Sequence, residues 1–113
     1  MNERKKDLKM KAKQLENKNQ FLMEDEKQAI FQSYNSVIAI YDKENHNLTF
    51  GCDWDYSKTT LKHLYIYLRD VIYYDMTLEQ KQDIMEALQS VNTKKALQKL
   101  IDNKKINYES ELR

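Results

Sequence analysis

The sequence has no proline, one glycine (Gly51) and one cysteine (Cys52) among its 113 residues. A single cysteine excludes an intramolecular disulfide and a cysteine-rich zinc site, and a single glycine excludes a glycine-rich phosphate-binding loop. No hydrophobic run approaches the roughly 20 residues of a membrane-spanning helix, and the first 20 residues lack the apolar stretch of a secretory signal. These absences predict a cytoplasmic protein stabilised by packing alone, without a metal or cofactor.

The chain also lacks an excess of either sign of charge, since the formal net charge is only +1. Residues 1–20 carry seven basic and three acidic groups. Residues 21–57 carry two basic and seven acidic groups, and residues 58–113 carry ten basic and eight acidic groups. Nucleic-acid-binding proteins usually have a larger basic excess, because neutralising phosphates supplies most of their affinity. From length and charge we predict a projecting basic helical arm over residues 1–20 and a single α+β domain over residues 21–113.

Amino-acid usage indicates the kind of genome that encodes the chain. Phe, Tyr, Met, Ile, Asn and Lys, which have AT-rich codons, total 49 residues, whereas Gly, Ala, Arg and Pro total 9. This bias is typical of a low-GC bacterium, its phage or its plasmid.

The first third of the chain is rich in good helix formers. Residues 3–33 contain neither glycine nor proline, which favours one long helix. A heptad seam in this helix predicts a homodimer through residues 8–29, although Asn19 and Glu26 interrupt it. The alternative is a solvated N-terminal helix on a monomer. The seam consists of Leu8, Leu15, Leu22 and Ala29.

A change of period at Ser36 predicts a β-hairpin. Residues 36–41 are β-branched or aromatic, and residues 48–53 alternate apolar with small or polar side chains. The polar residues 42–47 between them favour a turn. We expect Leu48, Phe50 and Cys52 to face the core.

Three helices are predicted after the hairpin. Ser57 can cap a helix over about 58–75, in which Leu61, Leu64, Leu68 and Ile72 form an apolar face that covers the hairpin. Thr77 and Gln80 form a capping-box pattern that begins a second helix, and Asn92 begins a third. The apolar residues of the second helix are Leu78, Ile84, Met85, Leu88 and Val91. The predicted fold class is therefore α+β, with a long N-terminal helix, an antiparallel β-hairpin and three helices packed on it.

Acidic and aromatic residues gather around the predicted hairpin, with Asp42 and Glu44 at its loop. The helix that follows has more tyrosines than one apolar face can bury, so some should be exposed. Tyrosine and tryptophan dominate interface hot spots, which predicts a protein-binding surface. The alternative is that the carboxylates cap the helix and Trp54 closes the core. The predicted surface comprises Asp53, Trp54, Asp55, Tyr56, Tyr67 and Tyr74.

Catalytic patterns are weak. His63, Tyr67, Asp70 and Tyr74 share one helical stripe apart from the apolar face. His63 and Asp70 are seven residues apart, or about 10 Å along a helix, and are not expected to touch. We therefore predict no catalytic residue and no metal site.

The C-terminal half offers an alternative function. Residues 77–105 resemble a helix-turn-helix followed by a strand, as in winged-helix proteins, although the usual small residue before the turn is absent. This resemblance implies an accessory DNA-binding protein whose nucleic-acid-binding residues are Lys94, Lys95, Lys99, Lys104 and Lys105.

The favoured interpretation is a non-enzymatic adaptor or inhibitor that occupies the surface of another protein, such as a basic nucleic-acid-binding enzyme. The codon bias suggests a phage or mobile element, and an anti-defence protein, including an anti-CRISPR, fits by analogy of size only.

Overall fold

The computed structural model describes residues 11–14 and 19–112, with side chains from residue 19 onward. Six strands form one sheet in the order β1-β2-β3-β4-β5-β6. The first five run as antiparallel neighbours, and the short C-terminal strand β6 pairs parallel with β5. The strands are β1 (Lys11–Gln14), β2 (Gln20–Glu24), β3 (Gln28–Ser33), β4 (Ser36–Asp42), β5 (Asn47–Gly51) and β6 (Asn107–Glu109).

The class α+β is confirmed, but the predicted long N-terminal helix is wrong. Lys11–Gln14 is a strand, and β2 and β3 occupy residues assigned to the second half of that helix. Ala29 is fully buried and Leu22 nearly so, both in strands, so they form no helical seam. Leu8 and Leu15 lie outside the described residues, as does most of the predicted arm over residues 1–20.

A turn signal separates β2 from β3. Asp25 Oδ1 accepts hydrogen bonds from the backbone amides of Lys27 (2.8 Å) and Gln28 (3.0 Å). This local arrangement is an alternative to helical hydrogen bonding, and it returns the chain beside itself. Tertiary pairing with β4 then overrides the helix propensity of the sequence.

The hairpin of β4 and β5 forms where the sequence predicts it. Leu48 and Phe50 of β5 face the core, as does Tyr41 of β4. Cys52 follows the end of β5 and is exposed, so its predicted core position is wrong. The strand ends before Cys52 because the chain turns there, with the amide of Trp54 donating to the Gly51 carbonyl at 3.2 Å.

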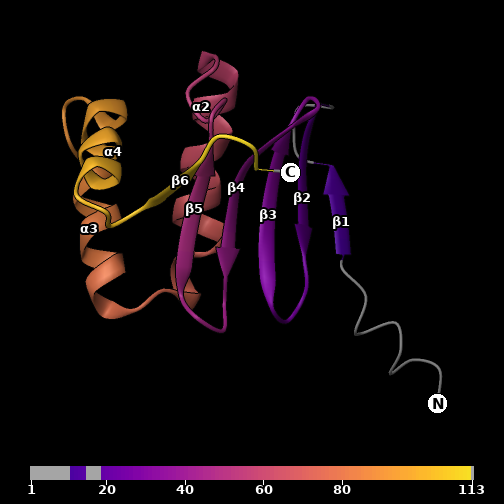
Figure 1. Cartoon of the computed structure of the whole chain (residues 1–113), viewed down its shortest axis with the longest axis horizontal. Helices are drawn as coiled ribbons and strands as arrows, with labels where there is room; N and C mark the ends of the chain where they lie inside the picture. The colour runs from indigo at the N-terminus through magenta and orange to yellow at the C-terminus, as the bar shows by residue number, and fades with distance from the viewer. Residues whose placement is uncertain (1–10, 15–18, 113) are drawn as a thin grey trace.

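The segment after the hairpin crosses one face of the sheet, behind β4 and β5 (Figure 1). It consists of α2 (Lys58–Ile66), the π-helical turn η1 (Tyr67–Val71) and the 3-10 turn η2 (Tyr73–Asp75). Leu64, Leu68 and Ile72 are fully buried, as the apolar spacing predicts, whereas Leu61 of the same predicted face is only partly buried.

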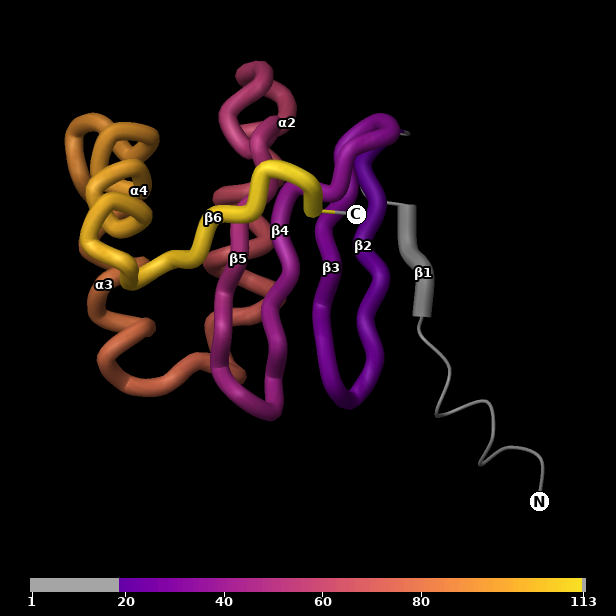
Figure 2. Tube along the Cα trace, in the orientation of Figure 1, coloured from indigo at the N-terminus to yellow at the C-terminus, as the bar shows by residue number. Residues whose placement is uncertain are grey.

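Two further helices, α3 (Leu78–Leu88) and α4 (Thr93–Asp102), stand beyond β5 on the side away from β1 (Figures 1 and 2). Thr77 and Gln80 form the predicted capping box, and Asn92 caps α4 by accepting from the Lys95 amide at 3.0 Å. Leu78 and Val91, expected on the apolar side, are instead exposed. Among the described residues, no helix combines the length and apolar content that crossing a membrane requires.

Candidate protein-binding site

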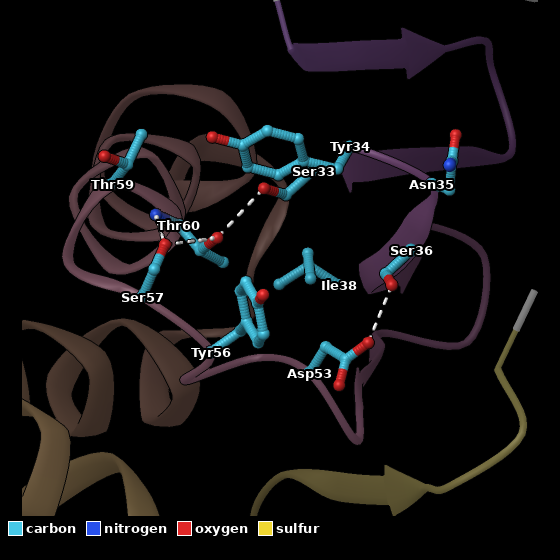
Figure 3. A pocket seen from close by; sticks show the side chains of 10 residues that line it. All are labelled: Ser33, Tyr34, Asn35, Ser36, Ile38, Asp53, Tyr56, Ser57, Thr59 and Thr60. Atoms are coloured by element: carbon cyan, nitrogen blue, oxygen red, sulfur yellow. Dashed lines mark hydrogen bonds between the residues drawn. The ribbon is translucent and has the colours of Figure 1, made fainter.

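An open pocket of about 610 Å³ lies between the β3–β4 turn and the beginning of α2 (Figure 3). Three chain segments that are distant in sequence build it: the turn, the connection from β5 to α2, and the first turn of α2. The lining residues are Ser33, Tyr34, Asn35, Ser36, Ile38, Asp53, Tyr56, Ser57, Thr59 and Thr60.

Hydroxyl groups fix one wall of the pocket. Ser57 caps α2 by accepting from the Thr60 amide at 3.1 Å, and its hydroxyl donates to Thr60 Oγ1 at 3.1 Å. Thr60 Oγ1 lies 2.9 Å from Ser33 Oγ, and both residues are buried. This network ties the beginning of the helix to β3 and fixes the position of this wall relative to the sheet.

Two tyrosines flank the opening. Figure 3 shows the rings of Tyr34 and Tyr56 at the pocket with Ile38 between them. The side chains are 45% and 72% exposed, respectively. Tyr34 is the first residue of the two-residue turn between β3 and β4, and its φ of 55° lies in the left-handed region. Turns of this kind normally place glycine there, because a side chain raises the energy of that backbone conformation.

Asp53 supplies the negative charge at the pocket. Its Oδ2 accepts a hydrogen bond of 2.7 Å from the Ser36 hydroxyl, which orients the carboxylate (Figure 3). Asp53 also lines a second open space of about 460 Å³ that reaches Leu112 near the C-terminus. Within residues 19–112 it forms no ion pair, so no described cation compensates its charge.

Asp55 is the second carboxylate of the same connection, and it is already paired. Its Oδ2 lies 3.8 Å from the ammonium of Lys94 at the beginning of α4. This loose, partly exposed pair adds little stability. It does join the predicted acidic surface to the predicted lysine surface, so these two are neighbours rather than separate faces.

Two of the predicted binding residues belong to the core. Trp54 is 3% exposed and packs on Phe50 with ring centroids 5.3 Å apart. Tyr67 is 1% exposed, and its hydroxyl donates to the Ala29 carbonyl at 2.6 Å. Burial raises the pKa of Tyr67 well above its ordinary value. Their assignment to an exposed surface is therefore corrected. Of the alternative, the part in which Trp54 closes the core holds, but Ser57 rather than a carboxylate caps α2.

Tyr74 is 78% exposed, but it lies in η2, at the far end of the helical segment from Tyr56. Asp42 and Glu44 lie at the opposite end of the β4–β5 hairpin from Asp53, because the strands run between them. Asp42 accepts hydrogen bonds within its own turn, chiefly from the Asn45 side chain, which lower its pKa. The acidic and aromatic residues that are close in sequence thus separate into two regions.

The predicted stripe of His63 and Asp70 is divided between core and surface. His63 is 3% exposed, and its Nδ1 donates to the Thr59 carbonyl at 2.9 Å, whereas Asp70 is exposed and pairs with Arg69. The expectation that His63 lies apart from the apolar face is wrong, because this side of α2 packs on the sheet. In the part of the chain that the structure describes, no three His, Cys, Asp or Glu side chains are placed to hold a metal ion.

The lysines of the DNA-binding alternative are partly neutralised. Besides Lys94 with Asp55, Lys105 pairs with Glu79 at 2.7 Å and lies 3.7 Å from Asp83. Its hydrogen bond to Glu79 raises the pKa of Lys105. Lys95, Lys99 and Lys104 are exposed.

Sequence reasoning missed Tyr34 and Ser36 as site residues. The signal was the polar stretch Ser33–Tyr34–Asn35–Ser36 between two apolar runs, which is typical of a tight turn. Assigning residues 28–33 to a helix concealed it. Only the folded sheet places this turn opposite Asp53 and Tyr56.

The sequence model of a family described as "Family of unknown function (DUF8033)" matches residues 1–87. No curated protein and no solved structure matches the chain.

Proposed function

The chain belongs to DUF8033, a family of unknown function, and we propose that it acts without catalysis by binding another protein at the pocket between Tyr34 and Tyr56. Such a protein serves as an adaptor or, where the occupied surface is one that its partner needs, as an inhibitor.

One observation supports this proposal above the others: Tyr34 is half exposed at a backbone position that favours glycine. A left-handed conformation costs a residue with a side chain about 1–2 kcal/mol. Strained residues of this kind concentrate at functional sites, where the side chain supplies something that the fold itself does not need. An exposed tyrosine beside a second, more exposed tyrosine gives the rigid amphipathic contact area that interface hot spots use.

The chemistry of the site favours a basic partner. Residues 21–57 contain seven acidic and two basic side chains, and Asp53 lies at the pocket without an ion pair among the described residues. An arginine or lysine side chain of the partner can enter between the two rings, contact their faces and pair with this carboxylate. A basic nucleic-acid-binding enzyme is one partner of this kind. An origin in a phage or mobile element is proposed on composition alone.

The test uses matched baits in extracts of the source cell. The chain, Tyr34→Ala with Tyr56→Ala, and Tyr74→Ala are immobilised, and bound proteins are quantified by mass spectrometry. Tyr74 is a matched control because its exposure resembles that of Tyr56. We expect a basic protein that the chain and Tyr74→Ala retain and the double variant loses. The purified partner should then bind with at least about 2 kcal/mol less free energy to the double variant.

Two outcomes would contradict the proposal. If all three baits retain the same proteins, the tyrosine pocket is not the binding surface. If binding is instead to DNA, falls steeply with salt and is lost in Lys95→Glu with Lys99→Glu, the accessory DNA-binding function is favoured.

A further inference from the structure

The helix α2 is apolar on its outward side as well as on its inward side. Leu61, Tyr65 and Ile66 line an open groove of about 540 Å³ on the outward side. Leu61 and Tyr65 pack at the margin of the core, and partial burial raises the pKa of Tyr65. A surface helix normally presents polar residues outward, so this strip of apolar area is available for a contact.

Positive side chains border the groove. Lys58 and Lys62 are one helical turn apart, exposed, and without an ion pair to any residue of the described chain. The third cation, Arg69, forms two hydrogen bonds of 3.0 and 2.9 Å with Asp70 and is therefore largely compensated. The groove thus combines an apolar floor with two lysines, at one end, that no described carboxylate compensates.

We propose that this groove binds an acidic amphipathic helix of a partner protein. Its apolar side chains would cover Leu61, Tyr65 and Ile66, and its carboxylates would pair with Lys58 and Lys62. The groove extends from Lys58 to Arg69, which in helical rise is about 16 Å, or three turns of the bound helix. The choice of occupant rests on charge complementarity, because carboxylates of an acidic segment would attract the ammonium groups of both lysines. No residue of this groove lines the tyrosine pocket, so the inference is independent of the proposed function.

The experiment measures fluorescence polarisation of a labelled amphipathic peptide of about three to four helical turns, with leucine on one face and glutamate on the other. Comparison peptides have the same composition in scrambled order, or lysine in place of glutamate. The protein variants are Lys58→Glu with Lys62→Glu, and the control Lys95→Glu with Lys99→Glu. The control pair is also exposed, four residues apart and on a helix, so it changes the net charge equally.

We expect the amphipathic acidic peptide to bind at least about tenfold more tightly than either comparison peptide. The Lys58/Lys62 reversal should weaken it about tenfold, and the Lys95/Lys99 reversal less than about twofold. Equal binding of the scrambled peptide, or equal losses in both variants, would overturn the proposal.

Two other occupants are outcomes of the same test. If light scattering shows self-association of the unliganded protein that the Lys58/Lys62 reversal abolishes, the groove binds a second copy. If the protein sediments with phosphatidylserine vesicles through these lysines while the peptide does not bind, it contacts a membrane surface. Either result overturns the acidic-helix proposal.

Discussion

Replacing Tyr67 with phenylalanine removes one hydroxyl from the centre of the structure and leaves the ring in place. That hydroxyl donates to the Ala29 carbonyl at 2.6 Å, and both residues are buried. Without it, a carbonyl oxygen that water cannot reach loses a hydrogen bond, which costs about 1–3 kcal/mol. Tyr67→Ala also removes the ring packed on Phe31, with centroids 5.8 Å apart, and should cost about 3–5 kcal/mol, as large aromatic truncations do.

Urea unfolding measures both losses, with the fluorescence of Trp54 as the probe. Trp54 is the only tryptophan and is buried, so its emission should report on the core. The difference between the two variants separates the hydrogen bond from the packing of the ring. A loss below about 0.5 kcal/mol for Tyr67→Phe would refute the argument, because the hydroxyl would then not be a needed donor. Lost partner binding at unchanged stability would instead restore Tyr67 to an exposed surface.

Three further predictions concern the core, a close backbone contact and pH. Leu68→Ala should lower the unfolding free energy by about 2–5 kcal/mol in the same urea assay, because Leu68 is fully buried. A loss below about 1 kcal/mol, as small as that of a surface substitution, would contradict this packing. Gly51→Ala should lower the stability measured by thermal unfolding by about 1–3 kcal/mol. The new Cβ would lie 2.5 Å from the Val37 carbonyl oxygen, so the backbone would have to shift. An unchanged transition temperature would show that the backbone accommodates the methyl group without cost. Burial, followed by the nearby carboxylate of Asp75, raises the pKa of Tyr41 to about 12 from 10.0. Because the folded state holds this proton more tightly, the stabilisation is complete below pH 10 and is lost as pH rises from 10 to 12. Unfolding of Tyr41→Phe should show a weaker decline over that range, and identical pH profiles would exclude this contribution.

The pocket shows why local sequence was insufficient to locate the site. Exposure of Tyr56 follows from its position at the junction of strand and helix, and the sequence indicated it. Tyr67 and Tyr74 are seven residues apart on what the sequence predicts as one helical stripe, yet one is buried and the other exposed. The π-helical turn at Tyr67–Val71 and the 3-10 turn after it change the rotation per residue, so a regular helical period does not continue through them.

Elements whose signals are local could be predicted from the sequence. The hairpin of β4 and β5 has a clear turn, the caps at Ser57, Thr77 and Asn92 satisfy free amides of the next turn, and the spacing of Leu64 and Leu68 defines a buried face. Each of these depends on residues only a few positions apart.

Residues 20–33 form strands because of their tertiary pairing, which no local signal indicates. Their many helix-forming residues favour a helix. Their apolar side chains occur on both faces of each strand, so the sequence shows no alternation of apolar and polar residues. Ala29 and Phe31 face the core while Ile30 pairs with Ile40 on the other face. Pairing with β4 adds hydrogen bonds and burial. Their free energy outweighs the helix propensity of these residues, which is roughly a few tenths of a kcal/mol per residue. The same strand pairing places Tyr34 and Asp53 in the lining of one pocket. These residues are far apart in the sequence, so no local pattern could predict that they lie together.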